Sequence, residues 1–153
     1  MNFDQFLAQA WQDHAHKPEV VAERLSQFRL DSQDQILKIT GLITHVFGEH
    51  LGRWEEGIKL LEKLQAQADS PESRGSVYRS ISALKLAGGI SEQAEDLLDS
   101  DRVRVLCVAS SALTGQNHIA KAIEFYSEAL QIAEAGLADS DPGVRALAVT
   151  GNN

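Results

Sequence analysis

The chain has 153 residues, 43% of them apolar and 24% charged, which suits one globular domain with a continuous core. Its formal net charge of −8 disfavours nucleic-acid backbones and anionic membrane surfaces as partners, because both bind basic surfaces. No stretch approaches the ~18 apolar residues that a membrane-spanning helix needs. We therefore expect a soluble domain whose partner is neither nucleic acid nor membrane.

The cysteine count and the N-terminus indicate the compartment. Cys107 is the only cysteine, so an internal disulfide is excluded. The N-terminal segment carries Asp4 and has neither the basic region nor the apolar run of a secretion signal. A single thiol in such a chain fits a reducing compartment, and we expect a cytoplasmic location.

The first 32 residues predict a pair of helices. Apolar residues recur at helical spacing along the first: Phe3, Phe6, Leu7, Ala10 and Trp11. Pro18 ends this helix and suits the first turn of the next. The apolar stripe of Phe3, Phe6, Leu7 and Trp11 either caps the rest of the chain or stays exposed and self-associates.

Residues 33–89 predict three further helices. Asp31 or Ser32 can cap the first of them, which Gly52 breaks, and a partner helix follows from Trp54. The segment Ser70-Pro71-Glu72 then supplies a serine cap, a proline in the first turn and an acidic group near the positive helix end. Gly88-Gly89 closes this helix, whose apolar face is expected to comprise Val77, Tyr78, Ile81 and Leu84.

The remainder predicts a short helix over about residues 91–98, a long amphipathic helix over residues 119–137, and one more helix between them. Asp99-Ser100-Asp101 is expected to cap the middle helix, and Gly115-Gln116-Asn117 to form the turn that follows it. A last helix is expected to start at about residue 139. No stretch shows the alternation of apolar and polar residues that a strand would show. Short turns between helices favour antiparallel helical hairpins.

Two hairpins share a spacing of small and bulky residues. Small residues lie twelve positions apart in pairs: Ser82 with Ala94, and Ser110 with Ala122. Bulky residues lie four positions before and after these pairs: Tyr78 and Leu98, and Leu106 and Tyr126. This pattern resembles the tetratricopeptide repeat, in which small residues let two helices approach closely. The resemblance covers about residues 33–153 and implies an all-α, right-handed α-α superhelix of antiparallel helical hairpins, capped by residues 1–32.

The first hairpin matches the pattern less well. Gly52, Gly57 and Leu61 fall in place, but His45 stands where a small residue is expected, so looser helix packing is predicted there. Hairpin lengths also vary more than the family's regular ~34 residues. Another α-solenoid, such as a HEAT-type array, is the alternative.

The echo at the C-terminus predicts that the chain ends partway through a repeat. Residues 144–153 echo residues 103–112 and look like a first helix that has no second helix within the chain. We expect an incomplete last repeat and hence the N-terminal part of a longer protein. The competing interpretation is that this helix is itself the cap, and its apolar face could also mediate self-association.

No catalytic, metal or cofactor site is predicted. His14 and His16 are two residues apart, His45 and His50 five apart, and His118 is distant, so we interpret the histidines as scattered surface or packing residues. Cys107 has no evident basic partner. Neither a phosphate-binding glycine loop nor a buried acid pair is present. We therefore expect a protein that is not an enzyme.

The resemblance implies instead that the first helices line a concave surface that holds a peptide or a partner helix. Carried over residue by residue, the groove-facing positions are Arg79, Ser80, Ala83, Arg104, Cys107, Val108, Ser111, Arg145, Ala148, Val149 and Asn152. An arginine recurs on three helices, and its planar fork suits carboxylates, so an acidic partner segment is favoured. Asn152 could hold the ligand's backbone. The alternative is that these arginines pair with aspartates at the helix starts: Asp99, Asp101, Asp139 and Asp141.

The sequence thus predicts a non-enzymatic protein–protein interaction module. The alternative is a structural or oligomerisation domain that forms part of a longer repeat protein.

Overall fold

The computed structural model describes residues 2–27, 30, 32–91 and 97–138, and the regular secondary structure of this part of the chain consists of helices joined by short turns. Its elements in chain order are α1 (Phe3–Asp13), α2 (Pro18–Gln27), α3 (Gln33–Ile43), the π-helical segment η1 (Thr44–His50), α4 (Trp54–Gln67), α5 (Pro71–Ala87), α6 (Asp99–Gly115) and α7 (Ile119–Ala138). The predicted all-α class is confirmed for these residues. None of the helices described is long and apolar enough to span a membrane.

Local signals set most helix ends. Ser32 and Ser70 are N-caps whose side chains accept hydrogen bonds from the backbone N–H groups of Gln35 and Ser73, and Gly88 is the C-cap of α5. The predicted cap at Asp99-Ser100-Asp101 is wrong. α6 begins at Asp99 itself, with Leu98 as a N-cap that makes no side-chain hydrogen bond. The aspartates stand in the first turn, where they face the positive end of the helix.

Two predicted helices cannot be compared with the structure. Most of the short helix over residues 91–98 and all of the last helix from residue 139 lie outside the described residues. Leu98, expected to pack as a bulky residue, is 75% exposed.

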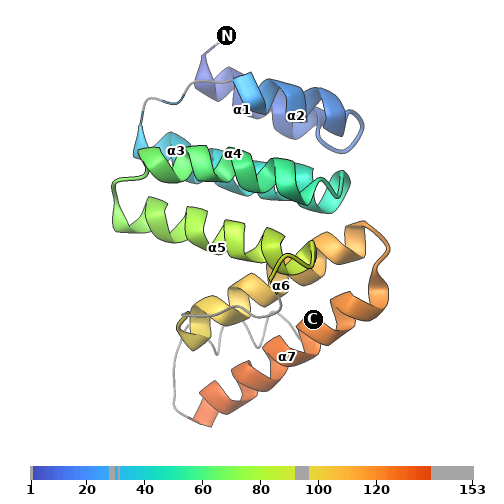
Figure 1. Ribbon diagram of the computed structural model, residues 1–153. Helices are drawn as coiled ribbons and strands as arrows, with labels where there is room; N and C mark the ends of the chain where they lie inside the picture. The colour runs from blue at the N-terminus through green and yellow to red at the C-terminus, as the bar shows by residue number, and fades with distance from the viewer. Residues whose placement is uncertain (1, 28–29, 31, 92–96, 139–153) are drawn as a thin grey trace.

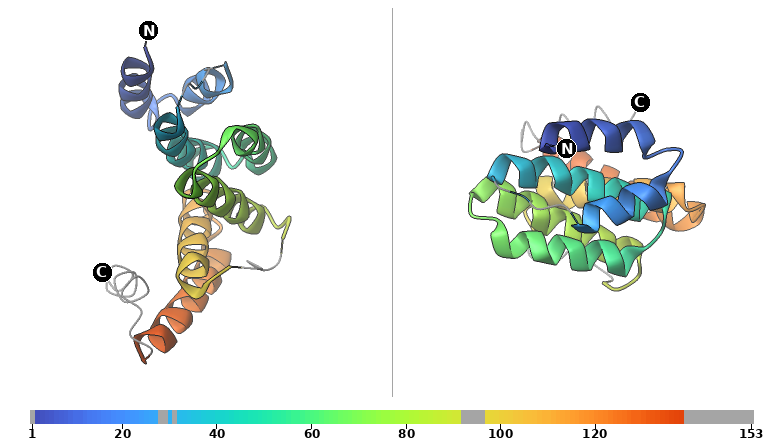
Figure 2. Two further views of the ribbon diagram at one scale, coloured as in Figure 1. Left: turned by 90° about the vertical axis from the view of Figure 1, so that its left-hand side faces the viewer. Right: turned by 90° about the horizontal axis from the view of Figure 1, so that it is seen from above.

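The helices stack in chain order from the α1–α2 pair at one end to α7 at the other (Figures 1 and 2). α3 contacts α5, α5 contacts α6, and η1 contacts α6, while α4 packs on α5 and α7 on α6. The C-terminal parts of three of these elements meet, because Gly48 of η1 lies against Leu84 of α5 and Ala112 of α6. α3–η1, α5 and α6 therefore run in the same direction.

Two apolar clusters hold the stack together. The first joins α1 to α5, and the second joins α5 to α7. Phe3 and Phe6 are buried in the first cluster, so this part of the N-terminal stripe packs inward, whereas Trp11 is 42% exposed. Tyr78 is also 42% exposed, so its predicted place on the buried face of α5 is wrong.

α6 and α7 cross at the small residues Ser110 and Ala122, which lie twelve positions apart in the sequence. The Ser110 hydroxyl donates to the Ala122 carbonyl over 2.8 Å, which requires the two helices to approach closely. Ala109 and Ala122 are buried beside this hydrogen bond. The bulky residue buried next to it is Phe125, while Tyr126 is half-buried.

The expected loose packing around His45 is wrong. A Cβ atom on Gly57 of α4 would lie 2.9 Å from the Cβ of Phe47 and 2.9 Å from Cδ1 of Leu84, so the helices are in close contact there. Phe47, and not His45, faces Gly57. The π-helical turn of η1 changes which side chains face inward, and it leaves His45 half-buried at the surface.

Candidate functional site

A groove lies on the face formed by α3, η1, α5 and α6. It has a volume of about 340 Å³, and its lining residues are Gly41, Thr44, His45, Glu49, Ser80, Cys107, Val108, Ser111 and Ala112. Four of these were placed on a concave face from the sequence: Ser80, Cys107, Val108 and Ser111. The structure brings these four together.

Other predicted groove residues lie elsewhere. Ala83 is 1% exposed and belongs to the apolar cluster between α5 and α6, so its predicted place in the groove is wrong. Arg145 lies outside the described residues, as do Ala148, Val149 and Asn152. The resemblance predicted the wrong position for Ala83, because the side of α5 that packs on α6 depends on how the two helices cross.

Two of the three arginines predicted to line the groove lie in the described part of the chain, and they differ. Arg79 Nη1 lies 3.4 Å from Asp101 Oδ1, and both side chains are 29% exposed, so for this arginine the alternative of pairing with a helix-start aspartate is confirmed. Arg104 is exposed and lies one helical turn before Cys107 and Val108. Of these two, Arg104 is therefore the arginine that a ligand in the groove could reach.

The Cys107 thiol is half-buried in the groove wall. Burial raises the pKa of this thiol above its ordinary value, because the charged thiolate is poorly solvated there. The protonated form predominates near neutral pH, and Cys107 lines the groove as a small, weakly polar group.

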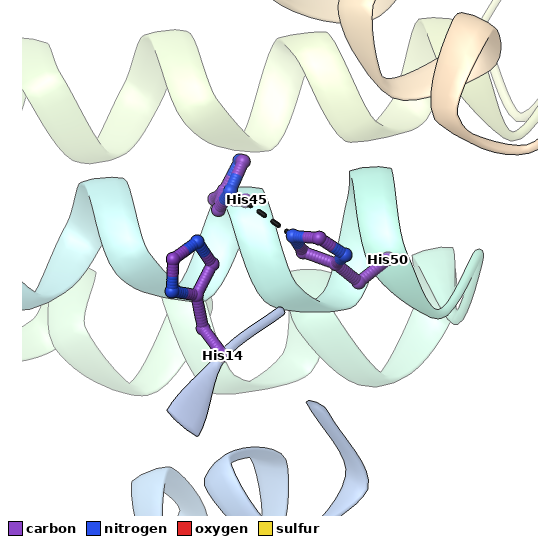
Figure 3. Close-up of side chains that lie close together, drawn as sticks. All are labelled: His14, His45 and His50. Carbon is purple, nitrogen blue, oxygen red and sulfur yellow. Dashed lines mark hydrogen bonds between the residues drawn. The ribbon is translucent and has the colours of Figure 1, made fainter. Parts of the chain in front are cut away.

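A cluster of three histidines lies beside the groove. His14 at the end of α1 meets His45 and His50 of η1, and one ring nitrogen of each lies within 4.8 Å of the other two (Figure 3). The ring centroids are 4.6 to 5.3 Å apart, and all three side chains are half-buried. The interpretation of these histidines as scattered is wrong, whereas His16 and His118 are exposed and do not belong to the cluster.

The π-helical backbone explains why His45 and His50 meet. In an α-helix, residues five apart point about 140° away from each other. In a π-helix the hydrogen bonds join residues five apart, which brings such side chains onto one side. The Leu51 N–H donates to the Val46 carbonyl over 3.0 Å in this pattern.

Two threonines lie at the start of the π-helical turn, Thr40 in the last turn of α3 and Thr44 as the first residue of η1. The Thr40 hydroxyl donates to the Ile36 carbonyl and the Thr44 hydroxyl to the Thr40 carbonyl, over 2.6 and 2.9 Å. Such bonds often bend helices. The two threonines four residues apart are the sequence signal that could have indicated an irregular helix here.

Hydrogen bonds orient two of the three rings. Nδ1 of His45 lies 2.7 Å from a Glu49 carboxylate oxygen, and Nδ1 of His14 contacts the Trp11 carbonyl. Because a carbonyl only accepts, Nδ1 of His14 carries the hydrogen and Nε2 keeps its lone pair. A carboxylate oxygen also only accepts, so Nδ1 of a neutral His45 ring carries its hydrogen toward Glu49.

The third ring completes the cluster. Nε2 of His50 lies 3.1 Å from Nε2 of His45. Burial lowers the pKa of His50, and the neighbouring His45 and His14 lower it further, whereas Glu49 raises it. The Trp11 ring lies beside two members of the cluster, with its centroid 5.1 Å from that of His14 and 5.9 Å from that of His45. His45 of the cluster and Glu49, which contacts it, also line the groove.

Comparison with known proteins assigns no family. No protein-family model, curated protein or solved structure matches this chain. Its function is therefore inferred from the site itself.

Proposed function

We propose that this protein is a non-enzymatic interaction module that binds a segment of a partner protein in the groove between η1, α5 and α6. The observation that carries the proposal is the convergence of Ser80, Cys107, Val108 and Ser111 on one groove. The proposal includes a tetratricopeptide-like, right-handed superhelical array. In it α3–η1, α5 and α6 are the first helices of successive hairpins, and their common direction supports this assignment.

The lining suggests the chemistry of the ligand. Val108 and Cys107 offer apolar surface, Ser80 and Ser111 offer hydroxyls, and the exposed Arg104 offers a fork for a carboxylate. A volume of about 340 Å³ is near the lower end of ligand pockets, so the groove would hold one or two side chains. We therefore propose a peptide or helix with an apolar anchor and an acidic neighbour, met in the cytoplasm.

The test is selection of peptides from a random display library. Val108→Asp places a charge in the groove at a position that is 40% exposed, so the fold should tolerate it. Ile123→Asp on α7 is the matched control, because Ile123 is also a β-branched residue, 59% exposed, and does not line the groove. Peptides selected on the natural chain should bind the Ile123 variant equally and lose at least tenfold in affinity for the Val108 variant.

The acidic neighbour is tested on the same peptides. Arg104→Glu should weaken peptides that carry an acidic residue, while Lys121→Glu, an equal charge change on α7, should not. Selected peptides that bind all variants equally would contradict the groove as the binding surface. A chain that selects no peptide and whose mass in solution rises with concentration would instead support the oligomerisation alternative.

A further inference from the structure

We propose that His14, His45 and His50 form a binding site for a divalent transition metal ion, and that zinc is the ion that suits it best. This inference concerns a site beside the groove, and it does not depend on what the groove binds. Imidazole nitrogens suit zinc, copper and nickel, whereas calcium and magnesium prefer oxygen ligands.

The nitrogen positions are close to those that zinc requires. Zinc–nitrogen bonds of about 2.0–2.1 Å at tetrahedral angles place the ligand nitrogens roughly 3.3 Å apart. Nε2 of His45 and Nε2 of His50 are 3.1 Å apart, and the third ligand nitrogen lies within 4.8 Å of both. Small side-chain rotations would bring His14 to the required distance.

The outer hydrogen bonds are those of metal-binding histidines. Such histidines usually donate the hydrogen of their other ring nitrogen to a carboxylate or a backbone carbonyl. Nδ1 of His45 donates to Glu49 and Nδ1 of His14 donates to the Trp11 carbonyl, so both Nε2 atoms carry lone pairs. Without an ion, the Nε2 lone pair of His45 accepts a hydrogen bond from Nε2 of His50, and an ion would replace that bond, with the His50 hydrogen on Nδ1. Glu49 is thus a positioning residue, which orients His45 without binding the ion.

The ion would join two parts of the chain. His14 ends α1, whereas His45 and His50 belong to η1, so a shared ion would fix the N-terminal helix on the first hairpin. Three protein ligands leave the fourth position of a tetrahedral ion to water. Binding to the folded state alone would stabilise it, and a free zinc concentration a hundredfold above Kd should raise Tm by roughly 5 to 10 °C.

The experiment is a zinc titration of the full chain, free of any histidine tag and stripped with a chelator, against a chromogenic competitor. We expect one zinc per chain. His14→Ala and His45→Ala should each weaken zinc binding at least a hundredfold, and Glu49→Gln about 10- to 100-fold. His16→Ala and His118→Ala are the matched controls and should change the affinity less than threefold.

A second readout separates coordination from folding. Cobalt bound in place of zinc should give the visible absorption of a tetrahedral ion with nitrogen ligands, and His14→Ala should abolish it in a chain whose circular dichroism is unchanged. A natural chain that binds less than stoichiometric zinc would overturn the proposal. Equal affinities of the natural chain and folded His14→Ala and His45→Ala variants would overturn it too.

Discussion

Close helix packing is achieved differently in two hairpins, that of α6 and α7 and that which begins with α3. Ser110 lies twelve residues before Ala122, and His45 lies twelve residues before Gly57. Ser110 occupies the helix crossing and donates to the Ala122 carbonyl in a regular α-helix. At His45 the backbone is π-helical, and Phe47 faces Gly57 instead.

The regular and the irregular hairpin contribute different things: the regular one mainly packing, and the irregular one most of the polar side chains of the candidate sites. The regular hairpin contributes one wall of the groove and a buried apolar cluster. The irregular segment contributes His45 and Glu49 to the groove and two histidines to the cluster with His14. A π-helical turn disturbs regular hydrogen bonding, and such turns are frequent at functional sites.

The largest expected effect is in the regular hairpin. Leu106 is 1% exposed, and Leu106→Ala should lower the free energy of unfolding by about 3 kcal/mol, because it removes buried apolar contacts and leaves a cavity. Urea unfolding followed by circular dichroism measures this. Val108→Ala, at a 40% exposed position on the same helix, should change it by less than about 0.5 kcal/mol. Equal losses in the two variants would contradict the burial pattern of α6.

The next effect tests the irregular segment. A Cβ atom on Gly48 would lie 2.9 Å from Cδ2 of Leu84 and 3.3 Å from the Cβ of Ala112, so Gly48→Leu should cost about 2 kcal/mol through overpacking. Gly41 is the control, since a Cβ there meets nothing within 4 Å, and Gly41→Ala should stabilise the helix by up to about 1 kcal/mol. The same unfolding measurement applies. A stable Gly48→Leu variant would mean that η1 does not pack against α5 and α6.

The smallest effect concerns the hydrogen bond at the regular crossing. Ser110→Ala removes the donor to the Ala122 carbonyl and should cost about 1 kcal/mol. Ser111→Ala removes an exposed hydroxyl from the adjacent position and should leave the free energy of unfolding nearly unchanged. A loss for Ser111→Ala as large as that for Ser110→Ala would argue against the crossing geometry.

Helix positions were largely predictable because local chemistry sets them. Ser32, Ser70 and Gly88 act at the helix ends where their residue types predict. The failure at Asp99 shows the limit of such signals, since a residue suited to capping also suits the first turn. The turn at Gly115-Gln116-Asn117 was also predicted, and Asn117 adopts the left-handed conformation there.

The groove was partly predictable and the histidine cluster was not. The resemblance placed Cys107, Val108 and Ser111 together, and their positions within four residues on α6 fit one helix face. Ala83 could not be placed correctly in this way, because its burial depends on how α5 crosses α6. The sequence did not decide whether Arg79 pairs with Asp101, because this ion pair also depends on how α5 crosses α6.

The sequence by itself determined the helical class, most helix ends and the small-residue contact between α6 and α7, because these depend on neighbours within a few turns or on a short hairpin. Only the tertiary structure decided that His14 meets His45 and His50. That meeting requires the C-terminal end of α1, which contacts α2 and α3, to lie near η1, and it requires η1 to leave the α-helical hydrogen-bond pattern. Both depend on the balance of packing energies across segments far apart in the chain, which local spacing does not contain.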